Sequence, residues 1–237
     1  MNQERLAPLT VHIPTAPGLR RCRDLELLVY VACQGVVTIE HVMAALAVGR
    51  TAAYRRVGHC VDAGLLERLE LLRTEPSMLR ATRRCLRHLG LDAMPVAEVT
   101  PATATHWLRC ASVARLLVER EFASYEVWSE RDLRLTEVTQ GRPIVAIKVG
   151  GLASGVPRRH RPDLAVINPE RKIAVEVELS LKAPRRLETI LRGWRRAGDV
   201  EEVRYYCPPG AVTRGVERAV ARTQTADKVR ILEAPTR

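Results

Sequence analysis

Three carboxylates in the second half of the chain have a spacing typical of a site for a hard metal ion. Asp163 opens one predicted strand, and Glu176 and Glu178 lie in the next, within RPDLAVINPERKIAVEVELSLK. Residues two apart share a face of a strand, so Glu176 and Glu178 are expected on the same side of the sheet. The turn residues Asn168 and Pro169 predict a hairpin that brings Asp163 beside them.

Two carboxylates on an otherwise apolar strand cost free energy unless a cation or hydrogen-bond donors neutralise them. Mg²⁺ or Mn²⁺ would do so, and carboxylate sites of this kind serve metal-assisted phosphodiester hydrolysis. The alternative is that Arg161, Arg185 or Arg186 pairs with the acids and builds a polar cleft without a metal. The sequence gives no indication of an organic cofactor.

A strongly basic helix is predicted directly after the acidic strand. The segment APRRLETILRGWRR has Pro184 near its first turn and arginines between apolar residues at helical spacing. Its predicted buried side consists of Leu187, Ile190, Leu191 and Trp194. We expect Arg185 and Arg186 to contact the DNA backbone, although a solvated face would give the same pattern. The run PRRHR, residues 157–161, is open to the same two interpretations: a loop that clamps DNA, or a solvated charged segment. Contact with phosphate is favoured for at least one of the two arginine-rich runs.

The pattern of the whole chain predicts an α+β protein with two domains. Residues 1–18 contain three prolines and predict an irregular arm, and residues 92–104 are rich in proline and small residues and predict a linker. Residues 19–91 have three helical patterns followed by a hairpin, which is the order of a winged helix-turn-helix. Residues 105–237 alternate strands and helices and predict a small α/β domain.

The third helix of the N-terminal domain, which opens with GRTAAYRR, is the candidate for reading DNA. The second helix of a helix-turn-helix pair enters the major groove, led by its N-terminal residues. Winged helices also bind proteins or form dimers, so a homodimer and a protein partner are alternatives. The residues expected to reach or flank double-stranded DNA are Arg50, Thr51, Tyr54, Arg55, Arg56 and His59.

The overall composition favours a polyanionic partner in the cytoplasm. The chain has 38 Lys and Arg against 27 Asp and Glu, a net charge of +11, which attracts nucleic acids. It has no apolar run of about 18 to 20 residues and no apolar segment near the N-terminus, so neither a membrane span nor a signal peptide is expected. The six cysteines contain no CxxC pair, which indicates free thiols rather than a zinc site or disulfides.

The segment Pro162-Asp163, followed by Glu176-Val177-Glu178, resembles the PD-(D/E)XK nuclease superfamily. The resemblance implies a metal held by Asp163 and Glu176. It also implies a third residue, two positions after Glu176, that orients or activates water. This residue is usually lysine, and here it is Glu178.

Two more residues enter through the same resemblance. Lys182, four positions after Glu178, is the candidate for the missing positive charge. A glutamate from the first core helix often joins such sites, and Glu130 in WSERDLR is the candidate for it.

Over roughly residues 22–206 the chain resembles the replication-relaxation family of actinobacterial plasmids, phages and integrative elements. The residues that carry the resemblance are VTIEHVMAALAVGRTAAYRRVGHCVDAGLLER, RPDLAVI and AVEVELSLKAPRRLETILRGW. The resemblance implies a winged helix joined to a nuclease-like domain, in a DNA-binding regulator or replication factor. The alternatives are a metal-dependent endonuclease or junction resolvase that uses Asp163, Glu176 and Glu178, and an assembly protein whose winged helix binds protein.

Overall fold

The computed structural model describes residues 22–71, 76–122, 125–151 and 157–235, and the arm predicted over residues 1–18 lies outside these ranges. The described chain mixes helices and sheets, in agreement with the predicted α+β class. It divides into two compact units, Met1–Arg115 and Leu116–Arg237. Within the described ranges, none of the helices is both long enough and apolar enough to cross a membrane.

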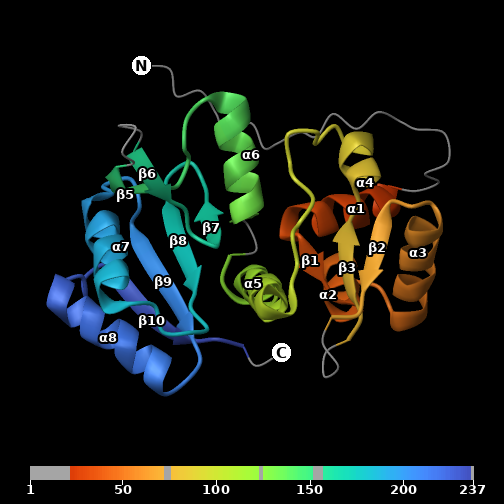
Figure 1. Ribbon diagram of the computed structural model, residues 1–237. Helices are drawn as coiled ribbons and strands as arrows, with labels where there is room; N and C mark the ends of the chain where they lie inside the picture. Colours follow the sequence, from red (N-terminus) through yellow and green to blue (C-terminus); the bar gives the residue numbers. More distant parts are fainter. Residues whose placement is uncertain (1–21, 72–75, 123–124, 152–156, 236–237) are drawn as a thin grey trace. The chain divides into compact units, whose positions relative to one another are not determined.

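The first unit combines helices with a three-stranded sheet (Figure 1). Strand β3 lies between β1 and β2 and runs antiparallel to both. The predicted order of three helices followed by a hairpin is present, and the short β1 adds a strand that the sequence did not predict. The elements are α1 (Cys22–Gln34), β1 (Val36–Val37), α2 (Ile39–Leu46), α3 (Arg50–Asp62), β2 (Leu66–Leu69), β3 (Met78–Ala81) and α4 (Arg83–His88).

Residues 92–104, predicted as a linker, pack against the first unit. Ala97 is buried with Ala104 and Leu108 of α5 (Pro101–Arg120) in a cluster that includes Val36 of β1. The Ala97 carbonyl accepts a hydrogen bond of 2.9 Å from Arg80 Nη1. The two units divide inside α5, after Arg115, rather than within this segment.

The second unit is built on a five-stranded sheet of order β10-β9-β8-β7-β4, with a separate β5-β6 ribbon (Figure 1). Strand β7 is antiparallel to β4 and β8, whereas β8, β9 and β10 are parallel. The elements after α5 are β4 (Glu126–Ser129), α6 (Glu130–Gln140), β5 (Ile147–Gly151), β6 (Pro157–His160), β7 (Leu164–Ile167), β8 (Lys172–Val177), α7 (Pro184–Arg196), β9 (Glu202–Cys207), α8 (Ala211–Thr223) and β10 (Val229–Glu233).

Helix α7 covers one face of the five-stranded sheet (Figure 1). The Trp194 side chain of α7 binds Glu176, so this is the face that carries Glu176. The apolar residues of α7 recur at helical spacing, and Leu187, Ile190 and Trp194 are buried as the sequence predicted. The helix comes close to the ribbon at Gly193, where a Cβ would lie 2.6 Å from Ile147 Cδ1. A residue without a side chain at position 193 therefore lets α7 rest on β5.

Two segments of the second unit differ from the sequence prediction. Glu130 begins a helix, α6, that was not predicted, although Ser129 and Asp132 form its capping box. The Ser129 hydroxyl accepts from the Asp132 amide at 3.2 Å, and the Asp132 carboxylate accepts from the Ser129 amide at 2.9 Å. The run PRRHR was predicted as a loop, but residues Pro157–His160 form β6, which pairs with β5.

Candidate functional site

The outer face of α3 presents polar groups that were predicted to contact DNA. Thr51, Tyr54, Arg55 and His59 are all exposed, and Tyr54 keeps 44% of its surface accessible although it is a large aromatic residue. Arg55 has no hydrogen bond or ion pair in the part of the chain that the structure describes. The apolar side of the helix faces the core, so among the described residues the polar face is open to a ligand.

The first residue of α3 also belongs to this face. Arg50 is exposed, and its Nη2 lies 3.6 Å from Glu40 Oε1 of α2. An ion pair between two solvent-exposed side chains contributes little free energy, so a phosphate would compete with Glu40 for this guanidinium.

Arg56 differs from the other predicted DNA-contacting residues because it points into the protein. It is only 8% exposed, and its guanidinium pairs with Asp24 of α1. Successive residues of a helix are about 100° apart around its axis, so the turn that exposes Arg55 carries Arg56 inward. The expectation that Arg56 flanks DNA is therefore corrected: its charge joins α3 to α1.

Glu176 lies in β8, whereas Asp163 comes just before β7 and Glu178 just after β8, so the predicted hairpin brings the three acids to adjacent strands. Strands β7 and β8 pair antiparallel, and Asp163, just before β7, accepts a hydrogen bond of 2.7 Å from the Val177 amide of β8. Glu176 and Glu178 are 1% and 4% exposed. Tyr205 of β9 is the register partner of Glu176, so its side chain shares the same face of the sheet.

Each of the two buried glutamates has a partner within the protein, and the partners of Glu176 were not named in the sequence analysis. Glu176 Oε1 accepts hydrogen bonds from His160 Nε2 at 2.6 Å and from Trp194 Nε1 at 3.1 Å. Glu178 forms an ion pair with Lys182, four residues along the chain. Each buried acid therefore has a cationic or donor partner within the protein.

The pKa shifts in this cluster follow from burial and from these pairs. Burial works to lower the pKa of His160, but the charge of Glu176 and its hydrogen bond raise the pKa above its ordinary value. Burial raises the pKa of Glu178, and Lys182 opposes this shift. Burial works to lower the pKa of Lys182, but Glu176 and Glu178 raise it. The shifts of His160 and Lys182 favour the charged form of each base beside its carboxylate.

These contacts bear on the metal expected at Asp163 and Glu176. Carboxylate oxygens are suitable ligands for Mg²⁺ or Mn²⁺. However, Glu176 Oε1 already binds two N–H donors, and Asp163 Oδ2 binds the Val177 amide. Each carboxylate has a second oxygen that a divalent cation could approach, but the charges of His160 and Lys182 beside it would oppose its binding. The acids are therefore already balanced by groups of the protein, and this arrangement disfavours a divalent metal.

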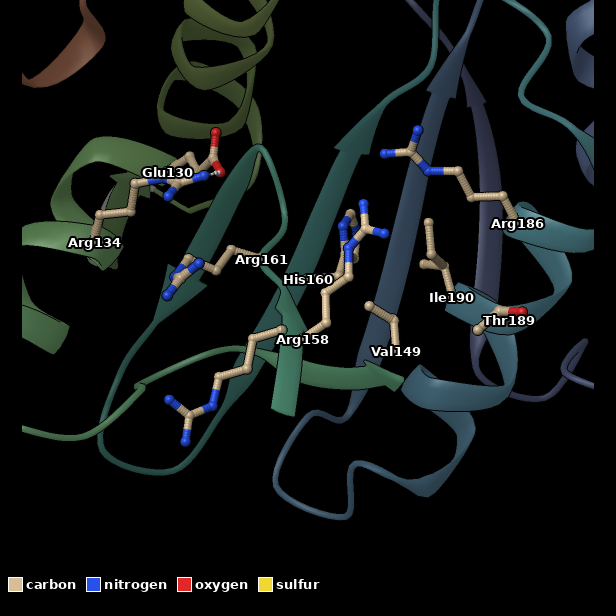
Figure 2. Close-up of a pocket in the computed structure, with 10 residues that line it drawn as sticks. Glu130, Arg134, Val149, Arg158, His160, Arg161, Arg186, Thr189 and Ile190 are labelled. Atoms are coloured by element: carbon tan, nitrogen blue, oxygen red, sulfur yellow. Dashed lines mark hydrogen bonds and ion pairs between the residues drawn. The ribbon is translucent and has the colours of Figure 1, made fainter. Parts of the chain in front are cut away.

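Glu130 was the remaining candidate for an acidic site. Its carboxylate pairs with Arg134 of the same helix (Figure 2), and Oε1 lies 2.6 Å from Nη2. Its backbone amide donates to the Asp163 carbonyl at 2.9 Å. The Glu130 side chain therefore binds a guanidinium, and it is the backbone that links this residue to Asp163.

A pocket of about 460 Å³ in the second unit is lined by residues of α6, β6 and α7 (Figure 2). His160 forms part of its lining, together with Val149 and Ile190 as apolar neighbours. Arg186, which was predicted to contact the DNA backbone, lines the pocket. Its neighbour Arg185, which was also predicted to do so, is exposed and lies outside the lining. The arginines in the lining are Arg134, Arg158, Arg159, Arg161 and Arg186.

The three arginines in and just after β6 divide into two groups by their ion-pair partners. Arg159 Nη1 lies 2.9 Å from Glu137 Oε1, and Arg161 binds the other oxygen of the same carboxylate. Arg158 has no ion-pair partner in the described part of the chain. Successive residues of a strand face opposite sides, so Arg158 and His160, which are two residues apart, share one side of β6.

Sequence reasoning missed the residues that bind Glu176. His160 lies within PRRHR, a run that drew attention for its arginines, and Trp194 was assigned only to the buried side of α7. Tyr205 is fully buried, and burial, followed by the charges of Glu176 and Glu178, raises its pKa well above the ordinary value. Only the period of two along PRRHRPD could have suggested that His160 lies on the opposite side of the strand from Arg159 and Arg161.

A comparison of the chain with protein-family models, with curated proteins and with solved structures finds no match. The function assigned below therefore rests on the residues and their geometry.

Proposed function

We propose that the chain is a DNA-binding protein that places α3 in the major groove of double-stranded DNA. The element order of the first unit, with α2 and α3 followed by the β2-β3 hairpin, supports a winged helix-turn-helix. The net charge of +11 supports attraction to a polyanion. In this proposal the protein acts as a regulator or replication factor of a mobile element, of the replication-relaxation type.

The second unit is proposed to have a nuclease-like architecture that contributes binding rather than cleavage. A hairpin joined to parallel strands, with Asp163 just before β7 and Glu176 in the neighbouring β8, supports the likeness to PD-(D/E)XK enzymes. The hydrogen bonds and ion pairs that occupy the acids favour a binding role over the alternative of a metal-dependent endonuclease.

The observation that carries the proposal is the outer face of α3, where polar side chains are exposed and Arg55 is unpaired among the described residues. An arginine can donate two hydrogen bonds to guanine O6 and N7. The hydroxyl groups of Thr51 and Tyr54 suit phosphate oxygens at the edge of the groove. This combination of one base-reading group and several backbone-contacting groups is what a recognition helix requires.

The test begins with selection of preferred duplexes from a random library by the full chain. Fluorescence anisotropy then compares a selected duplex with a scrambled one at fixed salt. Loss of a bidentate arginine contact costs about 1–3 kcal/mol of discrimination, so Arg55→Gln should weaken binding to the selected duplex by about 5- to 150-fold. Binding to the scrambled duplex should change much less.

Arg87→Gln is the matched control, because Arg87 is an exposed arginine on α4 of the same unit. It removes the same charge without touching α3. Wild-type discrimination in Arg55→Gln, or an equal loss in Arg55→Gln and Arg87→Gln, would remove α3 as the recognition helix.

A further inference from the structure

The pocket lined by five arginines in the second unit has more positive charge than the described residues neutralise. Of its five arginines, Arg134 pairs with Glu130, while Arg159 and Arg161 share the single carboxylate of Glu137. Five guanidiniums thus face two carboxylates, and His160 with Glu176 forms a further pair at the pocket. Like charges gathered in a concave site repel one another and focus a positive potential on any anion that enters.

The two arginines without ion-pair partners in the described residues come from different elements. Arg158 belongs to β6 and Arg186 to the first turn of α7, and both side chains are exposed. Figure 2 shows Arg158, His160 and Arg186 around the same pocket. Planar guanidiniums bind the oxygens of a phosphate in pairs, so two free forks on different elements can hold one phosphate from two sides.

The shape of the pocket restricts which phosphate fits. A duplex presents its phosphodiesters on a convex surface, which meets the rim of a pocket rather than its interior. A pocket of about 460 Å³ has room for a phosphate together with part of a nucleoside, and Val149 and Ile190 offer apolar contact to such a group. A phosphate monoester also carries a charge of about −1.5 to −2 at neutral pH, which suits the excess of guanidiniums better than the single charge of a diester.

We propose that this pocket binds a terminal phosphate monoester of a DNA strand, with Arg158 and Arg186 as its principal ligands. The proposal rests on the proposed function only in taking DNA as the source of the phosphate. It gives the second unit a binding role of its own, separate from the contact made by α3.

The experiment uses the full chain and a short single-stranded oligonucleotide, labelled at its 3′ end, with either a phosphate or a hydroxyl at the 5′ end. Fluorescence anisotropy at fixed salt should show about tenfold tighter binding of the phosphorylated strand, equivalent to about 1.4 kcal/mol. Arg158→Gln and Arg186→Gln should each remove most of this preference. Arg196→Gln, an exposed arginine of α7 outside the pocket lining, should keep it.

Equal affinity for the two strands, or a preference that survives both pocket variants, would overturn the proposal. Competition with thymidine monophosphate separates the two sources of a monoester. If the free nucleotide binds as tightly as the phosphorylated strand, the strand end is the wrong occupant. Binding of an unphosphorylated duplex and its dependence on Arg55 are measured in a separate experiment. Loss of the preference for the phosphorylated strand would therefore leave the role of α3 intact, and loss of the Arg55 effect would leave the phosphate pocket intact.

Discussion

Replacing Arg55 and Arg56 one at a time by alanine tests whether these neighbours have separate roles. Arg56 pairs with Asp24, and the two side chains are 10% and 16% exposed. Removal of one partner from a buried pair leaves the other charge without compensation and costs about 3–5 kcal/mol. Because both side chains keep some contact with solvent, we expect Arg56→Ala to lower the free energy of unfolding by about 3 kcal/mol, at the low end of that range.

The exposed neighbour should behave in the opposite way. Arg55→Ala removes a side chain without an ion pair in the described residues, and such surface changes usually alter stability by less than about 0.5 kcal/mol. We therefore expect Arg55→Ala to lose DNA discrimination and keep its stability. Arg56→Ala should lose stability and, where it remains folded, keep most of its discrimination.

Urea unfolding followed by circular dichroism measures the loss, and hydrogen exchange by mass spectrometry locates it. Faster exchange in α1 and α3, with unchanged exchange in the second unit, is the expected pattern. The double variant Asp24→Asn/Arg56→Gln removes both charges and should recover part of the loss. An unchanged urea midpoint in Arg56→Ala, together with a fall in DNA affinity like that of Arg55→Ala, would refute the assignment of Arg56 to the interior.

Two further predictions concern pH and metal. Burial, then the charge of Arg115, lowers the pKa of His41 to about 4 against the opposing effect of Glu40, so the folded state holds this side chain neutral. The unfolded state takes up the proton first, and the first unit should therefore lose stability as pH falls from about 6.5 towards 4. The Thr38 amide donates to His41 Nδ1 at 3.1 Å, a bond that protonation would break, and hydrogen exchange at pH 7 and pH 5 should show less pH dependence in His41→Gln. Supercoiled plasmid incubated with the protein and Mn²⁺ should stay intact on an agarose gel, because Asp163 and Glu176 already bind donors of the protein. Mn²⁺-dependent nicking that disappears in both Asp163→Ala and Glu176→Ala would instead make the chain an endonuclease.

Periodicity in the sequence predicted most of the elements and several of the faces. The hairpin that joins Asp163 to the strand of Glu176 followed from its turn residues, and the buried side of α7 followed from the spacing of its apolar residues. Helix α6 was missed although its capping box, Ser129 and Asp132, is visible in WSERDLR. Its polar composition gave a weaker signal than the strand-like residues just before it.

The sequence by itself determined which residues share a helix face or a strand face, because these relations depend only on the local repeat of the backbone. It did not determine which charged groups meet. Arg56 looked like another basic residue of α3 until the packing of α1 brought Asp24 to it, 32 residues away along the chain. Glu176 was expected to bind a metal or an arginine, and only the tertiary structure supplied His160 and Trp194, 16 and 18 residues away. A buried charge is stabilised by whichever donor the packing brings within hydrogen-bonding distance, and that choice is made by contacts between elements rather than by any one of them.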